Sequence, residues 1–190
     1  MQIQTVGILS PGDMGQAIAA VLNQNGLNGL YAVSDFQDAF NADHSFLFEM
    51  IQMSEETGAD RVRLCDTVGR TDPFVIFDIM ADILNNSAID IELHPHNDLN
   101  MAVANCVAAV KAFDIWYQDQ QETPSRKLYL TSTVNGIGER AGNTDLLATL
   151  VGALKVGLRI DVSVQESKLA SICDYVSQAS SRPIAINGLN

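Results

Sequence analysis

Short apolar segments alternate with longer stretches of helical periodicity along the whole chain. Five short runs rich in β-branched and apolar residues predict strands, at residues 5–9, 30–34, 61–66, 89–94 and 128–134. Six stretches carry apolar side chains at helical spacing, at residues 15–23, 42–57, 72–84, 100–113, 145–156 and 164–177. This alternation is typical of βαβ units, so it predicts an α/β fold with a parallel sheet of about five strands.

Turn and capping residues support several of these boundaries. Asp72 and Pro73 form a favourable helix start, with a capping carboxylate followed by a proline in the first turn. Residues 114–127 are polar and contain a proline, which predicts an extended connection. Pro95 has no amide hydrogen, so we expect it just past the hydrogen-bonded part of its strand.

Composition and charge narrow the classes of partner. The chain has 190 residues and a formal net charge of -12, which argues against nucleic acid or an anionic membrane surface, because phosphate binding needs clustered Lys and Arg. No apolar run approaches the roughly 18 residues of a membrane span. The three cysteines form no C-x-x-C pair, as expected of small buried side chains in a reducing compartment. We therefore expect a cytoplasmic protein with no membrane partner.

Polar side chains gather where three of the predicted strands end. Asp66 and Thr67 follow the third strand, residues 94–98 (HPHND) follow the fourth, and residues 135–143 follow the fifth. The carboxyl ends of parallel strands meet at one edge of a sheet, where α/β proteins build their sites. These three segments therefore predict one shared site.

His94 and His96 are the strongest chemical signal within these segments. Residues two apart on a strand point to the same face, so the two imidazoles can reach one point. Imidazole combined with carboxylate or amide oxygens suits Zn2+, Mn2+, Co2+ or Mg2+. The spacing indicates a metal site, although two histidines can also pack without a metal.

Four motifs occur in a fixed order: VSDFQDAFNADHSFLFE, ADRVRLCDTVGRTDPF, IELHPHNDLNMAVANCVAAVKA and STVNGIGERAGNTDLLATLVGALK. Together they resemble the homocitrate synthase and 2-isopropylmalate synthase family of TIM (βα)8-barrel metalloenzymes, relatives of the hydroxymethylglutaryl-CoA lyases. The similarity runs from about residue 33 to residue 187. It implies that residues 33–163 form a (βα)4 half barrel, equivalent to barrel strands five to eight, followed by a helix and linker at 164–190.

The resemblance also implies an activity and a set of site residues. The family joins acetyl-CoA to a 2-oxo acid in a Claisen-type condensation that depends on a divalent metal, here Zn, Mn or Mg. His94 and His96 would bind the metal, and Asn143 would lie at the metal or one water away. Glu139 would orient Asn143, and Thr67 would bind the carboxylate of the oxo acid.

Two features of the family pattern are missing. The chain has no Asp-Arg-Glu triplet, whose aspartate is the family's third protein metal ligand, and Gln37 stands near the position of a usual glutamate. A carboxamide cannot act as a carboxylate base, so we expect weak or no activity from this chain alone. Apolar surface left by a half barrel predicts a homodimer or a complementing chain that supplies the amino-terminal half barrel.

Residues 1–32 carry a different resemblance. TVGILSPGDMGQAIAAVLNQNGL is similar to the first Rossmann-like βα unit of 6-phosphogluconate and 3-hydroxyisobutyrate dehydrogenases, in which a glycine-rich turn binds a pyrophosphate. Gly12, Gly15 and Asp35 would then bind NAD(P), which makes a nucleotide-binding module one alternative function. A further alternative is an inactive structural α/β protein, in which this unit covers a sheet edge.

Overall fold

The structure is a computed structural model that describes residues 33–160 and 166–182. The strand expected at residues 5–9 and the helix expected at 15–23, with Gly12 and Gly15, lie outside the described residues. The expected boundary at residue 163 also lies outside them.

Four parallel strands form one sheet in the order β1-β2-β3-β4. Their bounds are Val33–Phe36 (β1), Arg61–Asp66 (β2), Asp90–Pro95 (β3) and Leu128–Leu130 (β4). Each strand pairs with the next strand along the chain, and the register sets Cys65 beside His94. The predicted parallel α/β sheet is therefore confirmed, with four strands in the described part of the chain.

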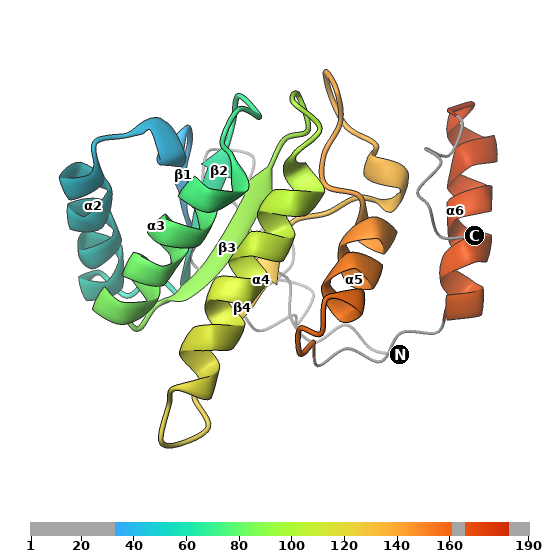
Figure 1. Ribbon diagram of the computed structural model, residues 1–190. Coiled ribbons are helices and arrows are strands. Elements are labelled where there is room, and N and C mark those ends of the chain that lie inside the picture. Colours follow the sequence, from blue (N-terminus) through green and yellow to red (C-terminus); the bar gives the residue numbers. More distant parts are fainter. Residues whose placement is uncertain (1–32, 161–165, 183–190) are drawn as a thin grey trace, which may run out of the picture.

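Helices connect the strands and cover one face of the sheet, whereas the last helix lies to the side and contacts the segment after the fourth strand (Figure 1). The helices are α2 (His44–Glu56), α3 (Pro73–Asn86), α4 (Ala102–Gln118), α5 (Leu146–Lys155) and α6 (Glu166–Ser180), with short 3-10 helices η1 (Ala39–Asn41) and η2 (Val134–Gly136). None of the helices in the described residues is long and apolar enough to cross a membrane.

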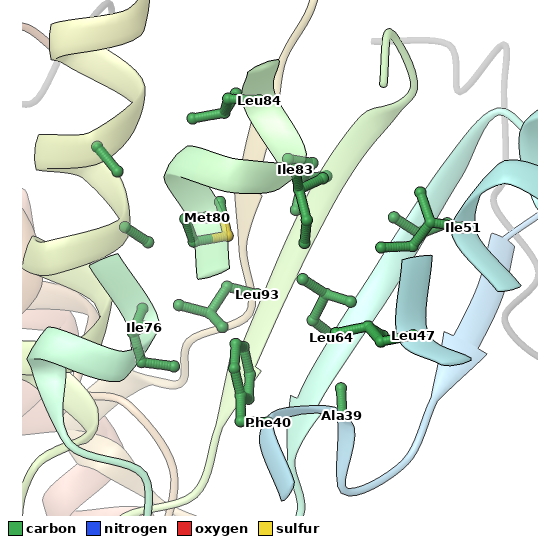
Figure 2. Packing of buried hydrophobic residues seen from close by; sticks show 14 of the residues in the cluster. Ala39, Phe40, Leu47, Ile51, Leu64, Ile76, Met80, Ile83, Leu84 and Leu93 are labelled. Carbon is green, nitrogen blue, oxygen red and sulfur yellow. The ribbon is translucent and has the colours of Figure 1, made fainter. Parts of the chain in front are cut away.

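The hydrophobic core lies between the sheet and helices α2 to α4. Figure 2 shows Leu47 and Ile51 of α2 together with Ile76 and Met80 of α3 around Leu64, which comes from β2. These five side chains are at most 3% exposed. Successive side chains of a strand point to opposite faces of the sheet. Because Leu64 points into this core, its neighbours in β2 point to the face away from the helices.

Charged and polar side chains lie on the opposite face of the sheet. Arg61 and Arg63 both pair with Glu92, and the Arg61 Nε atom lies 2.9 Å from the carboxylate. Thr131 donates a hydrogen bond of 2.7 Å to the same carboxylate. Two cations therefore share one buried anion on the face that also carries His94, two residues further along β3.

Capping side chains define the predicted helix starts. The Asp72 carboxylate accepts hydrogen bonds from the backbone N–H groups of Phe74 and Val75, with Pro73 in the first turn, as predicted. Asp43 caps α2 by accepting from Phe46, and Asp145 caps α5 by accepting from Ala148. Of these three caps only Asp72 was predicted, and helix α2 begins at His44 rather than at residue 42.

Several predicted boundaries were wrong, and among them β1 ends at Phe36 rather than at residue 34. Helix α4 continues five residues beyond Phe113, because Asp114 accepts from Gln118 and from Arg159, and because the ring of Trp116 packs against Phe113 at 5.5 Å. Strand β4 is shorter than predicted and ends at Leu130. Pro95 is the last residue of β3 rather than the first residue after it.

Candidate metal site at the carboxyl ends of the strands

The loops that follow β2, β3 and β4 are held together by backbone hydrogen bonds. The His96 amide donates to the Asp66 carbonyl at 3.3 Å, and the Asn97 amide donates to the Gly142 carbonyl at 3.0 Å. His96 and Asn143 also form an isolated antiparallel bridge. The three polar segments therefore meet at one edge of the sheet, as the strand ends predicted.

His94 and His96 lie side by side, with ring centroids 5.0 Å apart and ring planes at 29°. Both ring nitrogens of His94, the Nδ1 atom of His96 and the Oδ1 atom of Asn143 are shielded from solvent. Within the described residues none of these four atoms makes a hydrogen bond of ordinary geometry, although the Asn143 side chain lies close enough to His94 to act on its pKa. Buried polar atoms without partners cost free energy, so their convergence indicates a bound group that they would satisfy.

The environment of His94 favours its neutral form. Burial lowers the pKa of His94, and the neighbouring His96 and the charge of Arg63 lower it further. Asn143 and Asp35 act in the opposite direction but do not reverse the shift. A neutral imidazole has a free lone pair, which is the form that binds a metal.

Asn143 is held in place by a glycine-rich turn. Its Nδ2 atom donates to the Ile137 carbonyl at 3.3 Å, and its backbone N–H donates to the Gly136 carbonyl at 3.0 Å. A Cβ atom at Gly138 would lie 2.9 Å from the Asn143 Cγ atom, so only glycine leaves room for the carboxamide. The glycines of this segment therefore shape the position of Asn143.

Glu139 does not contact Asn143 in the structure. Its side chain is 70% exposed and pairs with Arg140 at 3.1 Å, because the turn directs it outward. The contact that orients Asn143 comes from the Ile137 carbonyl, which carries no signal in the sequence.

Thr67 lies at the end of β2 in a network with the end of β1. Its hydroxyl accepts from the Asp38 amide at 2.8 Å and donates to the Gln37 Oε1 atom at 3.0 Å. Gln37 in turn donates to Asp35 at 3.0 Å. To donate to a ligand carboxylate, the Thr67 hydroxyl would have to turn away from Gln37.

Asp35 and Asp66 are both engaged in contacts within the chain. Asp35 accepts from the Cys65 thiol at 3.1 Å, and burial, followed by that contact, raises the pKa of Cys65. Asp66 is 1% exposed and accepts from the backbone N–H groups of Arg70 and Thr71, each at 3.2 Å. Asp66 therefore shapes the β2–α3 turn, and Asp35 belongs to the edge of the candidate metal site.

The donor atoms fit a divalent metal only in part. Two imidazoles and one carboxamide oxygen are suitable ligands for Zn2+ or Mn2+. In the part of the chain that the structure describes, no group of three or more His, Cys, Asp or Glu side chains could hold a metal ion. The described residues therefore provide an open set of ligands.

The parallel sheet with its helices, and the loops gathered at its strand ends, match part of an α/β barrel. Residues 13–114 match the HMGL-like family, and the chain belongs to that family. The match begins within residues 1–32, the segment expected to be a separate unit.

Several proteins similar to this chain are synthases. The chain is 39% identical over 156 residues to 2-isopropylmalate synthase 2 of Caldanaerobacter subterraneus subsp. tengcongensis, covering 82% of this chain and 37% of the relative. It is 36% identical to citrate (Re)-synthase of Dehalococcoides mccartyi, covering 80% and 36%, and 34% identical to homocitrate synthase 1 of Nostoc sp., covering 80% and 37%. The chain thus spans little more than a third of the length of these relatives.

Solved structures show the same fold at low sequence identity. The HMG-CoA lyase from Pseudomonas aeruginosa superposes with a TM-score of 0.63 at 13% identity, over 88% of this chain and 54% of that one. The Acinetobacter baumannii HMG-CoA lyase, solved with coenzyme A and 3-methylmalate, gives a TM-score of 0.64 at 14% identity, over 95% and 61%. These likenesses support the half-barrel fold.

Proposed function

We propose that this chain is the metal-binding part of an enzyme that condenses acetyl-CoA with a 2-oxo acid. His94 and His96 bind a divalent metal, and Asn143 lies at the metal or one water away. The observation that carries the proposal is the convergence of four buried, unpartnered donor and acceptor atoms from these three residues.

Each residue has a role that its contacts support. A bound metal would polarise the keto group of the oxo acid as a Lewis acid. His94 presents a neutral imidazole because burial, the neighbouring His96 and the charge of Arg63 lower its pKa. Thr67 lies at the end of the adjacent strand, where its hydroxyl can turn from Gln37 to the substrate carboxylate.

The proposed reaction forms one carbon–carbon bond and releases free CoA. The methyl carbon of acetyl-CoA loses a proton and bonds to the keto carbon of the oxo acid, and the keto oxygen takes up a proton to become a hydroxyl. Water then hydrolyses the thioester to a carboxylic acid and the CoA thiol. The methyl proton must pass to a base, and Gln37 cannot accept it because a carboxamide is not basic. That base therefore has to come from outside the end of β1.

The relatives support the substrate class. The 2-isopropylmalate, citrate (Re)- and homocitrate synthases share one chemical type of product, a hydroxylated carboxylic acid. The Acinetobacter lyase with coenzyme A supports an acyl-CoA site on this fold. We also propose that residues 33–163 form the half barrel and that a helix and linker begin at residue 164. The half barrel would pair with a second copy of the chain or with a chain that supplies the other half barrel.

Titration with Mn2+ tests the metal site directly. Mn2+ should bind the wild-type chain, and the His94→Ala/His96→Ala variant should bind it at least a hundredfold more weakly. His44→Ala is the matched control, because His44 lies on α2 with a side chain that is 55% exposed and pairs with Asp82. Equal affinity in all three proteins would refute the metal site and favour an inactive structural protein.

An assay of CoA release tests the reaction. Acetyl-CoA is supplied with 2-oxoglutarate or 2-oxoisovalerate and Mn2+, and free thiol is measured. We expect little or no turnover, because the described residues provide neither an acidic metal ligand nor a base at Gln37. Robust metal-dependent turnover would show that this chain provides a complete catalytic site, and the expectation of weak activity would be wrong.

A further inference from the structure

Arg140 joins three loops at the carboxyl edge of the sheet. Its Nε and Nη2 atoms donate to the two carboxylate oxygens of Asp98 at 3.0 and 2.9 Å. The same Nη2 atom donates to the Thr67 carbonyl at 2.7 Å. The loop after β4 is therefore tied to the loop after β3 and to the loop after β2 by one guanidinium, which suits such planar, multiple contacts.

Asp98 is held against the β2–α3 turn independently of its ion pair. A Cβ atom at Gly69 would lie 2.8 Å from the Asp98 backbone N and 2.9 Å from its Cβ, so Asp98 packs into space that only glycine leaves. Gly69 also has a φ of 65°, and its carbonyl accepts from Leu99 at 3.2 Å. Arg140 thus binds a carboxylate that is already fixed beside Thr67.

Arg140 adopts an unfavourable backbone conformation to make these contacts. Its φ is 50°, a region that residues with a side chain rarely occupy. The cost of such a conformation persists only where other interactions require it. Here the bidentate contact with Asp98 and the hydrogen bond to the Thr67 carbonyl hold Arg140 in this conformation.

The candidate metal ligands are held by other bonds. Asn143 is fixed by the Gly136 and Ile137 carbonyls, and Asn97 donates to the Gly142 carbonyl. None of these bonds uses the Arg140 side chain. Removing that side chain should therefore move Thr67 relative to the metal ligands while leaving the ligands themselves in place.

We propose that Arg140 is a positioning residue that fixes Thr67 relative to His94, His96 and Asn143. This inference rests on the proposed function. A 2-oxo acid must be bound at two points, with its keto oxygen toward the metal ligands and its carboxylate toward Thr67, and Arg140 sets the separation of these points. Replacing Arg140 should therefore weaken oxo-acid binding and leave metal binding unchanged.

Binding of 2-oxoglutarate and 2-oxoisovalerate to the Mn2+-saturated chain tests this separation. Arg140→Gln should leave the Mn2+ affinity within about twofold and weaken oxo-acid binding roughly tenfold, the scale seen when a supporting contact of a metal site is removed. Arg140→Lys should lose less, because it keeps one charged contact with Asp98. Arg182→Gln is the matched control, because Arg182 donates to the Gly138 carbonyl at 3.4 Å and, among the described residues, forms no hydrogen bond with Thr67 or Asp98.

A double substitution separates positioning from general damage. Asp98→Asn removes the charge that holds Arg140, and combining it with Arg140→Gln should weaken oxo-acid binding no further than either change alone. Additive losses would show that the two residues act separately and would overturn the proposal.

Amide hydrogen exchange gives a readout that needs no substrate. The Asp38 amide donates to the Thr67 hydroxyl and the Asn143 amide donates to the Gly136 carbonyl. In Arg140→Gln the Asp38 amide should exchange faster while the Asn143 amide stays protected. A general loss of stability would accelerate exchange at both amides.

The outcomes distinguish the two proposals. If the wild-type chain binds no Mn2+, or binds Mn2+ without an oxo acid, the proposed function fails. If the wild-type chain binds both and Arg140→Gln behaves like Arg182→Gln, with unchanged exchange at Asp38, the role of Arg140 is overturned and the proposed function stands.

Discussion

Gly138 occupies a position where any side chain would press on Asn143. A Cβ atom there would lie 2.9 Å from the Cγ atom of the carboxamide and 3.1 Å from the backbone N of the same residue. We predict that Gly138→Ala displaces the Asn143 side chain and lowers Mn2+ affinity about tenfold, as loss of a supporting contact does. Mn2+ titration and thermal unfolding of the same sample measure the two effects separately.

Gly152→Ala provides the control for that substitution. A Cβ atom at this position of α5 would lie 3.6 Å from the Val107 Cγ2 atom, which is ordinary contact. We expect unchanged Mn2+ affinity and a gain of about 0.5–1 kcal/mol in stability from the better helix propensity of alanine. If Gly138→Ala also binds Mn2+ like the wild type, Asn143 does not contribute to the metal site.

At the scale of elements, Asp43 makes the start of α2 sensitive to pH. The Ser45 hydroxyl and the Phe46 amide both donate to its carboxylate, and these bonds lower the pKa of Asp43 below its ordinary value. When folding lowers the pKa of a carboxyl group, the folded state is stabilised at every pH above the pKa of that group in the unfolded chain. This stabilisation is lost as the pH falls through the pKa of the group in the folded protein.

Urea unfolding at a series of pH values tests this cap. The difference in free energy of unfolding between wild type and Asp43→Ala should be constant from pH 7 to 5. It should shrink as pH falls below about 4, the ordinary pKa of an aspartate. A difference that stays constant down to pH 3 would show that the carboxylate charge does not carry the cap.

Arg126 connects the end of α3 to the start of β4. Its guanidinium donates to four backbone carbonyls, those of Ile83, Leu84, Ser87 and Ile89. Arg126 is 8% exposed, and this burial lowers its pKa to about 10. We predict that Arg126→Met destabilises the protein by about 2–4 kcal/mol, because buried carbonyls lose their donors.

Lys127→Met is the control for Arg126→Met. The Lys127 side chain is exposed, so its replacement should change the free energy of unfolding by less than about 0.5 kcal/mol in the same urea experiment. Equal effects of the two substitutions would mean that the carbonyl contacts of Arg126 are not what stabilises this junction.

Sequence predicted those elements and contacts that depend on near neighbours or on strand geometry. The Asp72 cap followed from its own turn, and the meeting of His94 with Asn143 followed from the shared edge of parallel strands. The length of α4 did not follow, because it depends on packing of Trp116 and on an ion pair with Arg159, which lies 45 residues from Asp114. The bond of Arg140 to the Thr67 carbonyl spans 73 residues and had no local signal.

At the scale of the whole molecule, the chain has a net charge of -12, and the cations around the candidate site are paired with carboxylates. Arg61 and Arg63 share the Glu92 carboxylate on the open face of the sheet, and Arg140 pairs with Asp98 and Glu139 at the rim. These side chains leave no local excess of positive charge that would attract an anionic substrate. A bound divalent metal would itself supply the positive charge that a 2-oxo acid needs.

Metal binding should also be visible as stability of the whole fold. Ligands that bind only the folded state stabilise it, by about 2.7 kcal/mol at a free concentration of 100 times Kd. For a chain of this size that corresponds to a rise of roughly 5–10 °C in Tm. We predict this rise with Mn2+ for the wild type and for His44→Ala, and its absence for His94→Ala/His96→Ala.

The thermal shift distinguishes a folded site from loose association. His94 and His96 come from one strand end, but Asn143 reaches them only when β3 and the loop after β4 are packed together. A site assembled from these three residues must therefore disappear on unfolding, which couples its occupancy to Tm. If Mn2+ binds to the wild type without raising Tm, the ions are held equally by the unfolded chain, and the convergence of these three side chains is not what binds them.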